Sequence, residues 1–276
     1  MTRRHLVAPH AWLLVALCLP ACAGALCGQE KSVKPGINDP FKDPNVEEYL
    51  KKFEVESREI YAQRKEVVAA MKLKPGMAVA DIGAGTGLFT RLFAAEVGDK
   101  GKVYAVDIAP KFIEHIEKTS KEAGLKNVVG VVCTPISTKL PPESVDVVFV
   151  CDTYHHFEFP FRTLQSIHDA LKPGGQLVVI DFHRIPGKTS EWILYHVRAG
   201  QEVFVKEIVA SGFKQVEELK FLKDNYFVRF EKVPPKEPKQ PGGAQALPLE
   251  RLGDHFTTPA TTRRFGILPT LTRATS

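Results

Sequence analysis

The sequence predicts an α/β fold in which helices cover both faces of a mainly parallel sheet. Between residues 77 and 210, short apolar runs alternate with segments whose apolar residues recur every three or four positions. This alternation is typical of parallel strands joined by helical crossovers. The composition, with 44% hydrophobic and 25% charged residues among 276, is that of a globular protein. It excludes a collagen-like chain, a wholly disordered chain and a multi-span membrane protein.

The elements are expected in a regular order. Apolar residues at helical spacing over 46–71, ended by Pro75-Gly76, predict one or two amphipathic helices. Residues 213–221 and 225–231 predict an antiparallel hairpin that turns at Lys223-Asp224. Between them we expect strands at 77–82, 102–106, 128–132, 145–150 and 176–180, and helices at 88–97, 111–123, 161–171, 191–197 and 202–210.

The N-terminal segment, residues 1–28, has the pattern of a secretory signal peptide. Arg3 and Arg4 precede an apolar run over 11–19, and small residues follow over 21–25. The run is shorter than the ~20 residues that span a bilayer, and an uncleaved membrane anchor is the alternative interpretation. We expect export, either to the periplasm or tethered to a membrane. An anchor would instead allow the domain to stay on the cytosolic face.

The positive charge lies mostly at the two ends of the chain. The net charge is +5, but residues 1–28 and 232–276 are basic and the part between them is near neutral. Nucleic-acid binding needs basic residues clustered on the fold itself, so we expect no nucleic-acid partner. Residues 29–45 predict an extended lead-in, 46–231 the folded domain, and 232–276 a disordered tail rich in Pro and Thr.

A glycine-rich turn follows the first expected strand and opens the next helix. It reads Asp81-Ile82-Gly83-Ala84-Gly85-Thr86-Gly87, and Asp107 ends the next strand. Glycines let the backbone approach a ligand closely, and an acid at that strand end can accept hydrogen bonds from ribose hydroxyls. A carboxylate before the first glycine would repel the pyrophosphate of a dinucleotide. Asp81 suits the cationic sulfonium and ammonium groups of S-adenosylmethionine instead.

Three further segments accompany this turn, at 103–108, 144–148 and 171–177. In order, the four resemble the motifs of class I S-adenosylmethionine-dependent methyltransferases. Residues 46–231 are most similar to the methyltransferase type 11/25 group, which includes ubiquinone/menaquinone-biosynthesis C-methyltransferases. The resemblance implies a Rossmann-like seven-stranded sheet of order 3-2-1-4-5-7-6, with strand 7 antiparallel and helices on both faces. It also implies S-adenosyl-L-methionine as the cofactor.

The resemblance assigns cofactor contacts to several strand ends. Asp81 would face the amino-acid end of the cofactor, Asp107 its ribose and Ile108 its adenine. Many relatives carry an Asp after strand three, where this chain has Cys133-Thr134, so Thr134 is the candidate for the adenine amine. The expected cofactor-binding residues are Asp81, Gly83, Ala84, Gly85, Thr86, Gly87, Asp107, Ile108, Thr134 and Cys151.

Two cysteines, Cys133 and Cys151, lie within the predicted fold. Export would permit a disulfide between them. The implied strand order separates them by about 14 Å, whereas a disulfide needs Cα atoms within about 7 Å. Both thiols are therefore expected to be free.

The segment after the fourth strand supplies the candidate catalytic residues. In this type of fold substrate groups project from the strand ends, and here the segment carries Asp152, Tyr154, His155 and His156. Either histidine would act as a general base, with Asp152 or Tyr154 orienting the substrate. The alternative is that both histidines cap the next helix or pack beneath the cofactor.

Two later segments are further candidates. Asp181, after the fifth strand, would line the pocket, and Arg184 would pair with an acidic substrate; a solvated loop is the alternative. Trp192, Tyr195 and His196 lie where the resemblance places the substrate cover, with core packing as the alternative. No residues show the sequence spacing of a metal-ligand set, so no metal is expected.

The expected reaction is transfer of a methyl group from the cofactor to a small-molecule acceptor by in-line displacement. Two other classes stay open. A non-catalytic cofactor-binding protein that kept the fold is disfavoured by the intact Asp81 and Asp107. A nicotinamide-dependent oxidoreductase is disfavoured by Asp81 and by the glycine spacing. Cofactor binding separates all three.

Overall fold

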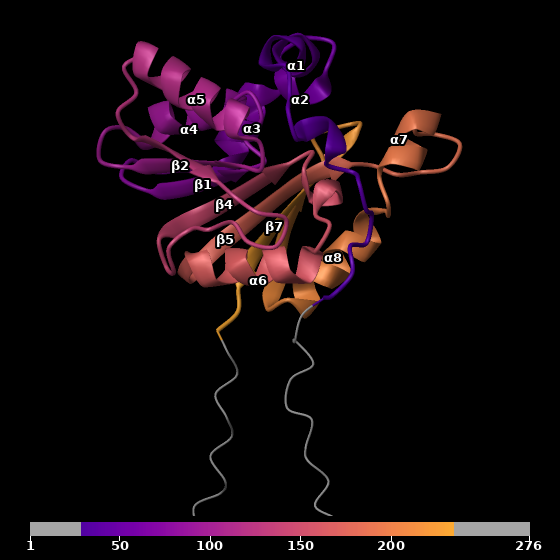
Figure 1. Cartoon of the computed structure of the whole chain (residues 1–276). Helices are drawn as coiled ribbons and strands as arrows, with labels where there is room; N and C mark the ends of the chain where they lie inside the picture. The colour runs from indigo at the N-terminus through magenta and orange to yellow at the C-terminus, as the bar shows by residue number, and fades with distance from the viewer. Residues whose placement is uncertain (1–28, 235–276) are drawn as a thin grey trace, which may run out of the picture. The chain divides into compact units, whose positions relative to one another are not determined.

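The computed structural model describes residues 29–234, which contain one seven-stranded sheet with helices around it (Figure 1). The predicted signal segment 1–28 and the predicted tail from residue 235 lie outside the described residues. The strands are β1 (Ala78–Ile82), β2 (Lys102–Asp107), β3 (Val128–Val132), β4 (Val145–Cys151), β5 (Leu171–Phe182), β6 (Phe213–Leu219) and β7 (Asn225–Lys232).

The strand order is β3-β2-β1-β4-β5-β7-β6. Strands β3, β2, β1, β4 and β5 pair in parallel, and β7 is antiparallel to both of its neighbours, β5 and β6. This confirms the Rossmann-like sheet expected from the sequence. The order reverses direction between β1 and β4, and ligands in such sheets bind outside the carboxyl ends of the strands at that point.

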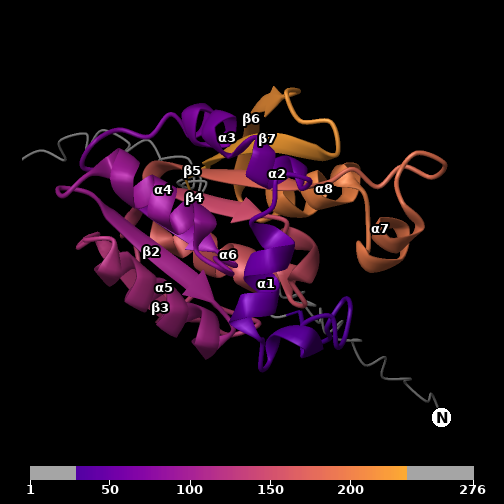
Figure 2. The same cartoon turned by 90° about the horizontal axis from the view of Figure 1, so that it is seen from above.

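The helices lie on both faces of the sheet, as predicted. Helices α3, α4 and α5 cover one face and α6 and α8 cover the other, as Figures 1 and 2 show from two directions. The helices are α1 (Val46–Phe53), α2 (Glu59–Ala62), α3 (Arg64–Met71), α4 (Leu88–Val97), α5 (Pro110–Glu122), α6 (Pro160–Ala170), α7 (Glu191–His196) and α8 (Gln201–Ala210).

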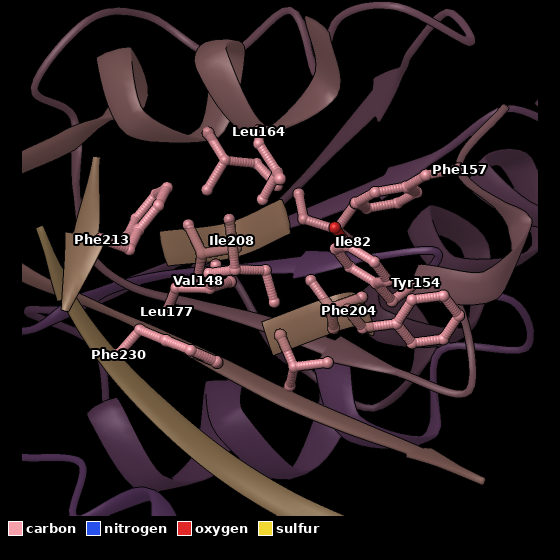
Figure 3. Close-up of a cluster of buried hydrophobic side chains, with 14 of the residues drawn as sticks. Ile82, Val148, Tyr154, Phe157, Leu164, Leu177, Phe204, Ile208, Phe213 and Phe230 are labelled. Carbon is pink, nitrogen blue, oxygen red and sulfur yellow. The ribbon is translucent and has the colours of Figure 1, made fainter. Parts of the chain in front are cut away.

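Side chains alternate between two cores along the central strand β4. Val148 and Val150 pack into the cluster beneath α6 and α8, which Figure 3 shows together with Leu164 and Phe204. Phe149, between the two valines, points to the opposite cluster under α3 and α4. A strand buried on both faces reads as a continuous apolar run, which is why 145–150 was recognisable from the sequence.

The region predicted as one or two helices, 46–71, forms three short ones. Helix α1 ends at Phe53, and Arg58, which precedes α2, has extended backbone (φ −91°, ψ 121°). The guanidinium of Arg58 pairs with Asp152 after β4, a contact that a helix continuing through Arg58 would not favour. Tertiary contact therefore overrides a helical pattern of apolar residues here.

The structure adds detail at other predicted elements. Strand β5 begins at Leu171 rather than at residue 176, and its register with β4 is irregular between Leu171 and Gln176. The lead-in 29–45 contains a 3-10 helix, η1 (Asp39–Phe41). Within residues 29–234, Cys133 and Cys151 are both free, as predicted. In the same range no helix is both long and apolar enough to cross a membrane.

Candidate functional site

A cavity of about 700 Å³ lies at the carboxyl ends of β1, β2 and β4. Its walls come from these strand ends, from the lead-in and α1, and from the 3-10 helix η2 (Tyr154–His156) that follows β4. Pockets for small molecules usually enclose about 300–1,000 Å³. The cavity is therefore large enough for a nucleoside cofactor, and it lies where the sheet topology predicts a ligand.

The glycine-rich turn between β1 and α4 lines one side of this cavity. Gly83 has φ of 72°, and a Cβ there would lie 2.3 Å from Cγ2 of Thr153. Gly87 has φ of 79°, and a Cβ there would lie 2.6 Å from Ile116 on α5. Both positions need glycine for its backbone and for space. Gly83 brings the turn against the segment after β4, and Gly87 packs the start of α4 on α5.

Asp107, at the end of β2, is held by backbone donors. Its Oδ2 accepts a hydrogen bond from the Gly85 N–H at 2.9 Å, and its Oδ1 accepts one from the Ala109 N–H at 2.9 Å. Burial raises the pKa of Asp107, and these backbone hydrogen bonds oppose the rise. The carboxylate is thus fixed at the cavity wall, and each oxygen keeps lone-pair capacity for a ligand hydroxyl.

Asp81, at the end of β1, lies deeper and is 4% exposed. Its Oδ2 accepts a hydrogen bond from the Thr90 hydroxyl at 2.7 Å. Burial raises the pKa of Asp81 to about 7, with the nearby Asp107 charge adding to the rise and the Thr90 bond opposing it. Two carboxyls enclosed at one cavity wall, with few cations beside them, form a site suited to a positively charged ligand.

The cavity gathers every predicted cofactor-binding residue except Gly87, whose place is in the packing of α4 on α5. Thr134 is at the wall, and its hydroxyl donates to the Ser137 carbonyl at 3.3 Å. Burial raises the pKa of Cys133 to about 12, so this wall carries a neutral thiol. The cavity-lining set is Asp81, Gly83, Ala84, Gly85, Thr86, Asp107, Ile108, Thr134 and Cys151. We call this part of the cavity the cofactor half.

Asp152 borders the cavity with both carboxylate oxygens engaged. Oδ2 pairs with the Arg58 guanidinium at 2.5 Å, and Oδ1 accepts from the Asn225 side-chain amide at 2.6 Å. Its φ of 46° is unusual for a residue other than glycine. Asp152 therefore joins the start of α2 to β7, a structural role that was not predicted. This role engages both carboxylate oxygens, which were expected to orient the substrate.

His155 and His156 line the cavity beside the cofactor half, as predicted. Nδ1 of His155 lies 2.8 Å from Oδ1 of the fully buried Asp181, whose Oδ2 also accepts from the His155 backbone N–H at 3.1 Å. Nε2 of His156 lies 3.3 Å from Nε2 of His196, the last residue of α7. The rings of Phe41, Phe182 and Trp192 each lie within 6 Å of one of these imidazoles. We call the three histidines and these aromatic residues the histidine half.

Tyr154 is not part of the cavity, and the substrate-orienting role expected for it does not fit its position. Its side chain is fully buried among Phe157 and Phe204 (Figure 3), and its hydroxyl donates to Glu207 at 3.0 Å. From η2 the side chain enters the core beneath α6 and α8. The sequence could not show whether Tyr154 lies in the core or in the cavity, because tyrosine is common in both.

Of the candidate residues after β5, some line the cavity and others do not. Asp181 contacts His155 rather than the cavity, and Arg184 donates to the backbone carbonyls of Leu194 and Val197. Arg184 thus supports the end of α7 and does not reach the cavity wall. Tyr195 is 87% exposed, whereas its neighbour Trp192 lines the cavity.

Sequence reasoning missed two contributions to the cavity. The lead-in supplies Ile37, Asn38 and Phe41, and Asn38 donates to the His156 carbonyl at 3.1 Å. Arg58, which precedes α2, also lines the cavity wall. The signal for the lead-in was weak, because an isolated apolar residue in a Pro-rich segment is seldom distinguishable from a loop residue.

Residues 80–179 match a family model described as "Methyltransferase domain". The match starts in β1 and ends in β5, so it spans the glycine-rich turn, Asp107 and η2. It therefore covers the cofactor half of the cavity and the two histidines that follow β4.

Curated relatives carry quinone-related names. The chain is 33% identical over 113 residues to the ubiquinone/menaquinone biosynthesis C-methyltransferase of Bordetella parapertussis, covering 41% of this chain and 43% of that protein. It is 30% identical over 126 residues to the demethylmenaquinone methyltransferase of Listeria welshimeri, covering 45% and 53%. The chain thus spans about half the length of the curated relatives it matches.

A solved structure extends the likeness over the domain. The structure of a SAM-dependent methyltransferase from Aquifex aeolicus has 26% sequence identity and a TM-score of 0.61, covering 67% of this chain and 98% of that one. Together with the family match, this confirms the resemblance to class I S-adenosylmethionine-dependent methyltransferases. It implies S-adenosylmethionine as the cofactor.

Proposed function

We propose that this chain is a methyltransferase that moves the methyl group of S-adenosylmethionine to an apolar small molecule bound in the same cavity. The observation that carries the proposal is the continuity of that cavity. One wall holds the glycine-rich turn with Asp81 and Asp107, and the other holds histidines and aromatic rings. A cofactor and an acceptor that share one enclosed space satisfy the proximity that in-line displacement requires.

The cofactor half fits this ligand by its charge and by its space. Gly83 and Gly85 have φ of 72° and 54°, so this wall of the cavity is formed by a turn that presents backbone without side chains at these two positions. Asp81 and Asp107 would face the cationic amino-acid end and the ribose, respectively. A dinucleotide would bring a pyrophosphate next to the carboxyls of Asp81 and Asp107, where like charges repel.

When bound, S-adenosylmethionine supplies an electrophilic methyl group on its sulfonium. The protein's own contribution is to hold the acceptor and to receive a proton where the acceptor carries one. Asp181 accepts from Nδ1–H of His155, which leaves Nε2 of that ring as the proton acceptor at the cavity wall. Phe182 beside His155, Phe41 beside His156 and Trp192 beside His196 favour a flat, apolar acceptor. The quinone-related names of the relatives agree with an acceptor of this kind.

The proposal is tested first by calorimetric titration of the purified chain with S-adenosylmethionine, S-adenosylhomocysteine and NAD. We expect Kd values near the micromolar range for the first two, about −8 kcal/mol at 1 μM, and no binding of NAD. Absence of binding by either sulfur compound in a folded protein would overturn the proposal. Binding of NAD alone would favour an oxidoreductase.

Asp107→Ala is the matched variant for the cofactor. It removes a charged acceptor whose hydrogen bonds contribute about 1.5–3 kcal/mol, so affinity for S-adenosylmethionine should fall by roughly 10- to 150-fold. An unchanged affinity would contradict the ribose assignment.

Transfer itself is tested by following S-adenosylhomocysteine release with a panel of quinols, phenols, amines and thiols. We expect turnover with a flat apolar member of the panel, and less turnover in the Asp107→Ala protein at limiting cofactor. Tight cofactor binding without turnover on any member would favour a non-catalytic binding protein.

A further inference from the structure

Three histidines from two distant segments meet in the histidine half. His155 and His156 lie on η2, and His196 ends α7, 40 residues after His156. One ring nitrogen of each lies within 4.8 Å of the corresponding nitrogens of the other two. Their ring centroids are 4.3 to 5.1 Å apart. Three imidazoles this close form a donor set that zinc and related divalent transition metals prefer.

The distance between two of these nitrogens already suits binding to one metal ion. Nε2 of His156 lies 3.3 Å from Nε2 of His196. Metal–nitrogen bonds of 2.0–2.1 Å in a tetrahedral site place two ligand nitrogens about 3.3–3.4 Å apart. Because Asp181 engages Nδ1 of His155, Nε2 is the atom that this third ring can offer.

The ring of His155 is fixed by a carboxylate, whereas one nitrogen of His156 has no hydrogen-bond partner in the described residues. Asp181 is fully buried and contacts Nδ1 of His155 with both oxygens, at 2.8 and 3.1 Å. A carboxylate on the far nitrogen of a ligating histidine is a recurrent arrangement that fixes the ring and strengthens the ligand. In contrast, Nδ1 of His156 is buried without a hydrogen-bond partner among residues 29–234. The ring of His156 is therefore held by one nitrogen contact only, that of its Nε2 with His196.

Some charged groups around the three histidines oppose a bound metal ion and one favours it. Lys34 is a nearby cation that opposes a bound metal, but its ammonium donates to the carbonyls of Tyr195 and His196. Arg184 likewise donates to the carbonyls of Leu194 and Val197. The carboxylate of Asp181 supplies compensating negative charge from the other side.

We propose that His155, His156 and His196 form a binding site for a divalent transition metal ion of the zinc class, with a coordination position open to the cavity. Three protein ligands and one open position are typical of catalytic rather than structural zinc sites. The inference does not depend on methyl transfer, because the cluster stands on its own contacts. A metal here would take the lone pair of His155 and would itself lower the pKa of an acceptor hydroxyl or thiol.

The test uses Co²⁺ as a spectroscopic probe and Zn²⁺ as its competitor. The full chain is purified without a histidine tag, stripped with a chelator, dialysed and titrated with Co²⁺. Visible d–d absorption reports low-coordinate cobalt, and metal analysis after equilibrium dialysis gives the stoichiometry. We expect one ion per chain, displaced by Zn²⁺.

Variants locate the ion. His156→Ala and His196→Ala should each weaken metal binding at least 100-fold, and Asp181→Asn should weaken it by 10- to 100-fold through His155. The matched control is His115→Ala, on α5 and outside the cavity, which should bind as the unmodified chain does. Circular dichroism confirms that each variant is folded, which keeps this test separate from the test of the cofactor.

Two results would overturn the proposal. One is the absence of stoichiometric metal binding in a chain that is folded by circular dichroism. The other is equal metal binding by the His196→Ala variant and the unmodified chain, which would place the ion at other histidines, such as those of the N-terminal segment.

Discussion

The two halves of the cavity are built in different ways. The cofactor half comes mainly from one short stretch, in which the β1–α4 turn and the end of β2 are neighbours in sequence and in space. The histidine half needs the lead-in, η2, the end of β5 and α7, which meet only when the sheet is complete. A local motif can thus specify one wall of the cavity, while the opposite wall depends on long-range packing.

The strongest test of this difference is Gly83→Ala. Gly83, in the cofactor half, packs against Thr153, the residue that precedes η2. A Cβ at Gly83 would lie 2.3 Å from Cγ2 and 2.4 Å from Oγ1 of Thr153. Overpacking and the positive φ each cost about 1–3 kcal/mol, so the turn must move. We expect affinity for S-adenosylmethionine to fall roughly 100-fold or more, measured by calorimetry.

Gly85→Ala is the control for this variant. Its φ is 54°, but the nearest side-chain atom to the added Cβ is Cε2 of Phe53 at 3.6 Å, an ordinary contact. The loss of affinity should therefore be much smaller than for Gly83→Ala. Equal losses in the two variants would show that backbone strain dominates, and that the contact with Thr153 is unimportant.

The same difference explains what the sequence could predict. The sheet order was implied by the resemblance to a known family. The cofactor half followed from motifs in which residue type and spacing carry the chemistry, such as Asp81 before the glycines and Asp107 one strand later. Tyr154 was misplaced because the direction of a side chain after β4 depends on the packing of α8, which local sequence does not encode. The grouping of His196 with His156 was missed because a metal-type cluster drawn from two loops has no fixed sequence spacing.

A second prediction concerns how the wall between the halves is held. Asp152→Asn leaves the Arg58 guanidinium, whose side chain is 26% exposed, without its anion. Because Arg58 keeps some solvent, we expect a loss of about 1–3 kcal/mol in the free energy of unfolding, less than for a fully buried pair. For a domain of this size that corresponds to a drop in Tm of roughly 2–12 °C, measured by calorimetry.

Glu56→Gln is the matched control, because it breaks the pair with Arg64 in the same N-terminal region. Glu56 is 71% exposed, so no measurable change in Tm is expected. If the two variants were equally stable, the Asp152 pair would not hold α2 against the sheet. Asp152 would then be available for the substrate role first expected of it.

The smallest expected effect concerns Asp81 and pH. Burial places the pKa of Asp81 near 7 in the free protein, with Thr90, Asp107 and Arg91 as its polar neighbours. A cationic ligand favours the ionised carboxylate and lowers this pKa in the complex, so binding below pH 7 must release a proton. Affinity for S-adenosylmethionine should fall by up to about tenfold between pH 7 and pH 6 and level off above pH 7.

The measurement is calorimetry at pH 6, 7 and 8 in buffers of different ionisation enthalpy, which counts the protons released. Asp81→Asn removes the titrating group, so it should bind more weakly at pH 8 with a flatter pH profile. Any dependence left in that variant belongs to Asp107, whose pKa burial also raises, or to the α-amino group of the ligand, which ionises at about pH 8. A wild-type affinity that is constant from pH 6 to pH 8 would mean that Asp81 does not meet a cation. The cofactor half would then bind its ligand through the glycine turn and Asp107 alone.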